Sequence, residues 1–123
     1  MNWLAVFVGG GAGSVLRYFI SLRVNPKAPD FPMATYFSNL LACAILAVVL
    51  ILASQKQDWN PRWSALLITG FCGGLSTFST FSLENVVLLR HGLWMTLFLN
   101  VFLSVGMGIA TIWFIARHYA TAD

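Results

Sequence analysis

Apolar residues fill four long blocks of this chain, separated by short polar connections, at about 2–22, 33–53, 62–89 and 93–117. A helix needs about 20 mostly apolar residues to cross the hydrocarbon core of a bilayer. The pattern therefore predicts an all-α membrane protein with a single four-helix transmembrane domain over residues 1–123. The first block is expected to stay in the protein, because no Lys or Arg precedes it and Arg17 interrupts its far end. Such a small bundle can barely enclose a pathway alone, so we expect an oligomer.

Composition agrees with a membrane location and argues against an enzyme. The 123 residues are 59% hydrophobic and 9% charged, against roughly 25% charged in an average soluble domain. His91 and His118 have no second metal ligand at usable spacing, and no Ser/His/Asp or Cys/His set is placed for catalysis. Cys43 and Cys72 fall inside predicted spans, where each is interpreted as a small apolar residue rather than half of a disulfide. No acid falls at mid-membrane in the first, second or fourth span; the four acids are Asp30, Asp58, Glu84 and Asp123.

The basic residues at the span ends are almost evenly divided between the two sides of the membrane. Because the Lys/Arg bias sets the direction of insertion, a near tie predicts that copies insert both ways. An antiparallel dimer, with a two-fold axis in the membrane plane, then becomes a specific expectation. One side carries Lys56, Arg62 and Arg117, and the other carries Arg23, Lys27 and Arg90, with Arg17 in addition if it snorkels outward.

The third block contains the stretch "GGLSTFSTFS" at 73–82, which is unusual for a spanning helix. Each glycine weakens a helix by about 1 kcal/mol relative to Ala, and Ser/Thr side chains can satisfy the backbone groups that a break sets free. The stretch therefore predicts a third helix broken near the midplane. Carbonyl oxygens at such breaks coordinate small cations in several transport folds. An intact helix whose small residues only pack is the alternative.

Phe78 and Phe81 lie three residues apart on one face of this segment and are flanked by hydroxyls. A phenyl ring has a positive edge, which can face a small anion without a fixed charge that would hold it too tightly. Ordinary core packing is the alternative for such an aromatic pair.

Two further spans carry polar stripes. An amide in hydrocarbon needs either a neighbouring helix or water in a cavity, so Asn39 is either an interhelical contact or a cavity residue. The stripe of the fourth span could lie against that of the second or against the hydroxyls of the third, as a file of hydrogen-bond donors. The stripes consist of Thr35, Ser38 and Asn39 in the second span, and of Asn100, Ser104 and Thr111, interrupted by Gly108, in the fourth.

The first span contains Gly9 and Gly13, a pair of small residues four apart. Small residues let helix backbones approach closely in lipid, so the pair predicts close helix packing. Arg17 lies one turn further along the same face. It is interpreted either as an anchor that snorkels to the interface or as a cation that attracts anions to a water-filled mouth. The Trp residues near span ends indicate an interfacial belt; they are Trp3, Trp59, Trp63 and Trp94.

Taken together, "TGFCGGLSTFSTFSLEN" (69–85), "GGGAGSVLRY" (9–18) and Asn39 strongly resemble the Fluc (CrcB-type) family of small bacterial fluoride channels. The resemblance covers the full chain in length, span count and motif order. It implies an antiparallel, dual-topology homodimer in the bacterial cytoplasmic (inner) membrane, which exports fluoride passively down its electrochemical gradient. It also implies two pores per dimer and a structural sodium ion at the dimer interface, held by backbone carbonyls at the break.

The resemblance further implies roles for individual residues. Ring edges of the pore phenylalanines would meet fluoride, hydroxyl and amide groups would donate to it, and charged residues would line the vestibules. The pore residues implied are Phe78, Phe81, Asn39, Ser79, Thr80 and Ser104, the vestibule residues are Arg17 and Glu84, and the sodium-binding carbonyls are those of Gly73 and Ser76, with the exact pair open within 73–77.

The chain departs from the family pattern in three places. Ala34–Thr35 stands where the family commonly has Gly-Thr, and Ala42 stands where it has glycine three residues after the asparagine; Gly108 interrupts the hydroxyl stripe. These changes leave the phenylalanines and the break intact and put the outer part of the donor file in doubt. The rival functions are a proton-coupled exporter of the small multidrug-resistance type, which needs an acid in the first span, and a non-transporting structural subunit.

Overall fold

The computed structural model describes residues 2–24 and 30–120, with side chains up to residue 117. Lys27, Asp123 and the side chain of His118 lie outside this described part. Four helices are long and apolar enough to cross a membrane: Asn2–Val24, Met33–Ser54, Pro61–Arg90 and Trp94–Arg117. Their bounds differ from the predicted spans by two residues or fewer at each end. The all-helical class and the four predicted spans are confirmed.

The third span consists of several segments. Asn60 caps its start, where the Asn60 side chain accepts a hydrogen bond from the Arg62 amide at 3.0 Å and Pro61 occupies the first turn. Helix α3 (Pro61–Ser64) is followed by η1 (Ala65–Cys72), a wider π-helical segment, and by one turn, α4 (Gly73–Leu75). Helix α5 (Phe78–Arg90) begins after two extended residues.

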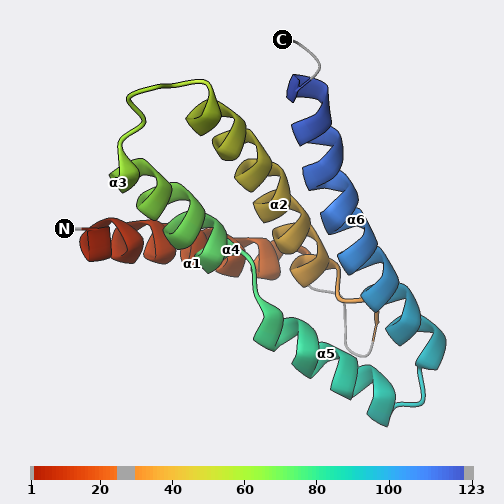
Figure 1. Cartoon of the computed structure of the whole chain (residues 1–123). Helices are drawn as coiled ribbons and strands as arrows, with labels where there is room; N and C mark the ends of the chain where they lie inside the picture. The colour runs from red at the N-terminus through yellow and green to blue at the C-terminus, as the bar shows by residue number, and fades with distance from the viewer. Residues whose placement is uncertain (1, 25–29, 121–123) are drawn as a thin grey trace.

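The break between α4 and α5 lies at Ser76 and Thr77. Ser76 has φ −78° and ψ 156°, and Thr77 has φ −152° and ψ 123°, so both are extended. Figure 1 shows the helical ribbon giving way to a plain connection between α4 and α5. The prediction of a broken third helix is confirmed, and the alternative of an intact helix is wrong.

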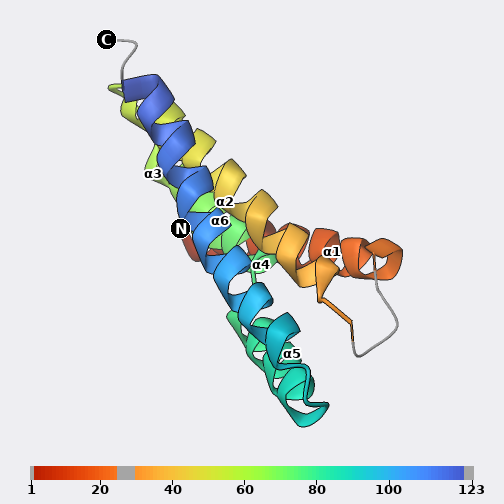
Figure 2. The same ribbon diagram turned by 90° about the vertical axis from the view of Figure 1, so that its right-hand side faces the viewer.

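The break separates two packing environments. Helix α1 (Asn2–Val24) lies along η1 and α4, before the break. Helix α2 (Met33–Ser54) and helix α6 (Trp94–Ala120) run side by side, as Figures 1 and 2 both show. Helix α5, after the break, packs against the first part of α6 (Figure 2). The third span therefore passes from the α1 side of the molecule to the α6 side where its helix is interrupted.

Helix α1 meets η1 and α4 backbone against backbone along a glycine seam, made of Gly9, Gly13, Gly70 and Gly74. A Cβ atom added at Gly70 would lie 2.9 Å from the Val6 carbonyl oxygen. Added Cβ atoms at Gly9, Gly13 and Gly74 would overlap the carbonyl oxygens of Leu66, Phe71 and Gly10. Only glycine allows this approach, which is the close contact that small residues permit between membrane helices. The close packing predicted for Gly9 and Gly13 is confirmed.

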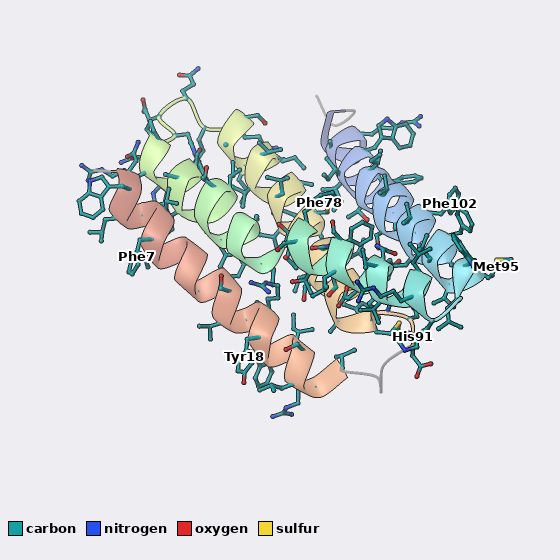
Figure 3. The ribbon with its side chains drawn as sticks, turned by 90° about the horizontal axis from the view of Figure 1, so that it is seen from below. Phe7, Tyr18, Phe78, His91, Met95 and Phe102 are labelled. Atoms are coloured by element: carbon teal, nitrogen blue, oxygen red, sulfur yellow. The ribbon has the colours of Figure 1, made fainter. Side chains whose placement is uncertain are left out.

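Large apolar side chains cover the outside, and the few buried apolar side chains are mostly small, with Leu75 and Leu88 as the largest. The exposed set includes Phe7 on α1 and Met95 and Phe102 on α6, which point away from the bundle in Figure 3. Trp3, Trp63 and Trp94, near the helix ends, are also exposed, as an interfacial belt requires. The buried apolar side chains are Ala34, Ala42, Ala47, Val49, Cys72, Leu75 and Leu88.

Candidate functional site

Side chains from α1 and α2 hold the break from both sides. The Asn39 side chain on α2 accepts from the Thr77 amide at 2.8 Å and donates to the Thr77 carbonyl at 3.4 Å. Arg17 and Ser14 on α1 both donate to the Gly74 carbonyl, at 3.1 and 3.4 Å. These bonds satisfy backbone groups that the interrupted helix sets free. Asn39 thus makes the interhelical contact that was one of its two interpretations, and Arg17 turns inward instead of snorkelling.

Two carbonyl oxygens at the end of α4, those of Gly73 and Ser76, accept no hydrogen bond from a side chain in the described part of the chain. Because the Thr77 amide goes to Asn39, the Gly73 carbonyl loses the donor that a continuous helix would supply. The Cys72 carbonyl accepts from the Ser76 amide at 2.9 Å and from its hydroxyl at 2.8 Å. Within the described residues, no side chain donates to the Gly73 or Ser76 carbonyl. Gly73 is exposed, with nothing within 4 Å of a Cβ built on it.

Beside the break lies an aromatic cavity of about 260 Å³, open at one side, between α2, α5 and α6. It brings together four predicted pore residues from three helices, with Cys43 on α2 beside them. Phe78 is 81% exposed, and Figure 3 shows it at the start of α5, facing the middle of the molecule. The Phe78 and Phe81 ring centroids are 6.0 Å apart, with 36° between the planes. The predicted pore residues in the wall of the aromatic cavity are Asn39, Phe78, Phe81 and Ser104.

A second, polar cavity of about 390 Å³ lies on the other side of Thr77, between α1, α2 and α5. It brings together Arg17, Glu84 and Thr80, which were predicted for the vestibule and the pore. Thr35 donates to Glu84 Oε1 at 2.7 Å. Glu84 Oε2 and Ser38 Oγ are buried without a hydrogen-bond partner in the described part of the chain. Buried polar atoms are normally hydrogen-bonded, so these two oxygens, beside a roomy polar cavity, indicate that it takes up water or polar solutes.

Thr77 lines both cavities and connects them. Its hydroxyl caps α5 by accepting from the Thr80 amide at 3.3 Å, and it donates to the Thr80 hydroxyl at 3.2 Å. It also lies 3.3 Å from the hydroxyl of Ser79, which is exposed and lines neither cavity. Thr77 was not among the predicted site residues. Its position directly after a helix break, as the N-cap of the next helix, is the signal that could have identified it.

A third group of polar side chains joins α5 to α6. Asn85 Nδ2 donates to the Phe81 carbonyl at 2.8 Å, and Asn100 Nδ2 donates to Asn85 Oδ1 at 3.1 Å. Ser104 Oγ donates to Asn100 Oδ1 at 3.2 Å. We call Asn85, Asn100 and Ser104 the amide chain. The α6 stripe therefore meets the third span at Asn85, an amide that the sequence pattern did not single out, and not at the hydroxyls that were one of its two expected partners.

Two other residues near the cavities, Cys43 and Gly108, have contacts that the sequence interpretation did not include. Cys43 and Cys72 both carry free thiols, and Cys43 lines the aromatic cavity instead of only filling space. Gly108, which interrupts the α6 stripe, is buried where an added Cβ would lie 3.4 Å from Cys43 Sγ. The interruption therefore lies where α6 packs against α2.

Comparison with known proteins gives a consistent result. A family model described as "CrcB-like protein, Camphor Resistance (CrcB)" matches residues 4–115. A protein from Serratia proteamaculans named "Fluoride-specific ion channel FluC" is 47% identical over 102 residues, which are 83% of this chain and 80% of that relative. A protein of the same name from Escherichia coli K12 is 45% identical with the same coverage.

Proposed function

This chain belongs to the CrcB-like protein family, and from that premise we propose that it is a fluoride-specific ion channel of the bacterial cytoplasmic (inner) membrane. It is a multi-pass membrane protein by the length and composition of its four helices. The function is passive export of fluoride down its electrochemical gradient, so the protein acts as a channel and not as an enzyme. The single observation that carries the proposal is the aromatic cavity, where two phenylalanines, an amide and a hydroxyl from three helices surround one space.

Fluoride is small and strongly hydrated, so a pathway must replace its water with donors. The positive edges of Phe78 and Phe81, the Asn39 amide and the Ser104 hydroxyl are the groups available in the aromatic cavity. None of them carries a full charge, so an anion held among them can also leave. Arg17 supplies positive charge to the adjoining polar cavity, where it would attract an anion toward the break. Thr77 supplies a hydroxyl in the wall of both cavities, and Thr80 supplies one in the polar cavity, whereas Ser79 lies outside both.

A single copy leaves the aromatic cavity open, because Phe78 is 81% exposed beside it. We propose that a second, inverted copy closes it, so that an antiparallel homodimer has two pores. The near tie of basic residues across the membrane supports insertion in both directions. The Gly73 and Ser76 carbonyls, at the C-terminal and therefore negative end of α4, fit a structural sodium ion shared between the two copies. Bound there, the ion would join the copies by electrostatic attraction.

The channel function is tested by ion efflux from liposomes that contain purified protein. A fluoride electrode in the outer solution should record rapid fluoride release. Chloride release from matched chloride-loaded vesicles should be slower by at least about tenfold. Equal rates for the two anions would contradict the proposal. Proton-driven efflux of an organic cation without any fluoride release would instead favour the multidrug-type exporter.

The inverted dimer is tested by labelling a C-terminal tag in sealed vesicles. We expect about half of the tags to react with an impermeant reagent added from one side, and the remainder after the vesicles are opened. Labelling from one side alone would exclude dual topology. Sodium is tested by replacing it with N-methyl-D-glucamine during purification, which should lower the dimer fraction in detergent; an unchanged fraction would argue against an interfacial ion.

A further inference from the structure

The hydrogen bonds of the amide chain can run in only one direction. The Phe81 carbonyl oxygen accepts and never donates, so the Asn85 atom 2.8 Å from it must be Nδ2. The carbonyl oxygen of the Asn85 side chain, Oδ1, is therefore turned toward Asn100. This oxygen also only accepts, so the Asn100 atom 3.1 Å away must be Nδ2.

The constraint then reaches Ser104. With its Nδ2 used on Asn85, Asn100 presents Oδ1 to the Ser104 hydroxyl at 3.2 Å. Ser104 has to be the donor in this contact, because an amide oxygen has no proton to give. The proton of a hydroxyl in the wall of the aromatic cavity is therefore directed into the α5–α6 interface. What Ser104 presents to the cavity is its lone pairs.

That orientation matters if an anion enters the cavity. To bind the anion, the Ser104 hydroxyl must turn away from Asn100 Oδ1. Asn100 is 1% exposed, so its oxygen finds no water to replace the lost donor. The anion thus competes with Asn100 for one proton, and the competition weakens the contribution of Ser104 to binding.

We propose that Asn85 is a positioning residue that sets the direction of the amide chain and thereby weakens the hold of Ser104 on an anion. Asn85 lines neither cavity: one of its bonds goes to the main-chain carbonyl of Phe81, and its side-chain oxygen reaches the cavity wall through Asn100 and Ser104. The inference rests on the proposed function, because it concerns the anion that the aromatic cavity conducts. Weaker binding speeds the departure of the ion, which conduction requires.

The variant Asn85→Leu tests the proposal. Without the Asn85 oxygen, the Asn100 amide can reverse, so that its Nδ2 donates to Ser104 and the Ser104 proton turns into the cavity. Initial fluoride efflux from liposomes, measured against internal fluoride concentration, should then show a half-saturating concentration lower by about fivefold, the equivalent of about 1 kcal/mol for one hydrogen bond. The maximal rate should fall, because the ion leaves more slowly.

The matched control is Ser82→Ala. Ser82 also lies on α5 and also donates to the carbonyl four residues before it, that of Phe78, at 2.9 Å. It has no bond to α6 among the described residues, so its loss should leave the half-saturating concentration unchanged.

The variant Asn100→Ala removes the competing oxygen directly and should shift the half-saturating concentration in the same direction as Asn85→Leu. It keeps the proposal testable if Asn85→Leu does not fold.

Coupling to Ser104 decides the outcome. In a Ser104→Ala background, Asn85→Leu should no longer change half-saturation, because the hydroxyl through which it acts is gone. The proposal would be overturned if Asn85→Leu changed the half-saturating concentration equally with and without the Ser104 hydroxyl. It would also be overturned if Asn85→Leu and Asn100→Ala both folded and both left the half-saturating concentration unchanged. Fluoride flux in the wild-type protein tests the channel function separately, so failure of this inference is distinguishable from failure of the function.

Discussion

The glycine seam and the aromatic cavity lie on opposite sides of the break in the third span, and they are built by contrasting rules. At the seam, backbones touch directly, and an added Cβ at Gly9, Gly13 or Gly74 would overlap a carbonyl oxygen. At the cavity, side chains from three helices surround open space, and Phe78 remains 81% exposed. The first region has no room for another atom, whereas the second keeps room for a solute.

The contrast indicates how a short membrane chain divides its tasks. No hydrophobic force drives helices together in lipid, so tight contact between small residues has to supply the stability. The glycine seam supplies this tight contact between α1, η1 and α4. Helices α5 and α6 are therefore free to present amides and hydroxyls. We therefore expect substitutions at the seam to affect folding and substitutions at the cavity to affect ion flux.

The largest effect is expected at Gly13. Gly13→Ala places a Cβ against the Phe71 carbonyl and 2.8 Å from the Leu75 amide, neither of which can move without separating the helices. We expect a loss of at least about 3 kcal/mol in stability and little folded protein by size-exclusion chromatography in detergent. Gly11→Ala, on the open side of the same helix, is the control and should be neutral or stabilising, since nothing lies within 4 Å. Equal behaviour of the two variants would refute the seam.

The next effect is expected at Phe78. Phe78→Ile removes a ring edge from the cavity wall without disturbing a packed interior, because the side chain is 81% exposed in one copy. Fluoride efflux should fall by at least about tenfold while the variant elutes at the same volume as the wild-type protein. A variant that loses stability but keeps its flux per folded protein would show that the ring only packs, which is the outcome expected of a structural subunit.

The smallest effect on stability is expected at Asn39. Asn39→Ala leaves the half-buried Thr77 amide without its 2.8 Å acceptor, which should cost about 1 kcal/mol in a thermal or denaturant scan. Flux should fall as well, because the amide also lines the aromatic cavity. Asn60→Ala is a matched control, since Asn60 likewise accepts from a backbone amide, that of Arg62, but at the exposed start of α3. It should lose a comparable or smaller stability and keep full flux; a similar loss of flux in both would place Asn39 outside the pathway.

The spans and the break could be predicted because both are local properties. Hydropathy over about 20 residues locates a spanning helix regardless of its neighbours. Glycines followed by hydroxyls mark where a helix is weak and where its freed groups can be satisfied. The family motif then pointed to Phe78, Phe81, Asn39 and Ser104, which the fold brings to one cavity.

The details that could not be predicted depend on contacts between helices. Whether Arg17 snorkels or turns inward depends on the distance from α1 to the Gly74 carbonyl, and that distance follows from packing at the glycine seam. Asn85 has its partner on another helix, so no periodicity within α5 identifies it. The π-helical course of η1 likewise has no signature in residue type or spacing.

The hydrogen bonds that hold the break restrict how the protein can move. Arg17 and Ser14 hold the chain at Gly74, just before the extended segment, and Asn39 holds it at Thr77, the second extended residue, so the segment is anchored at both ends. Unwound backbone that is anchored in this way cannot serve as a hinge. Its conformational entropy is lost once, during folding, so the part of the cavity walls that this segment forms is already ordered before any solute enters.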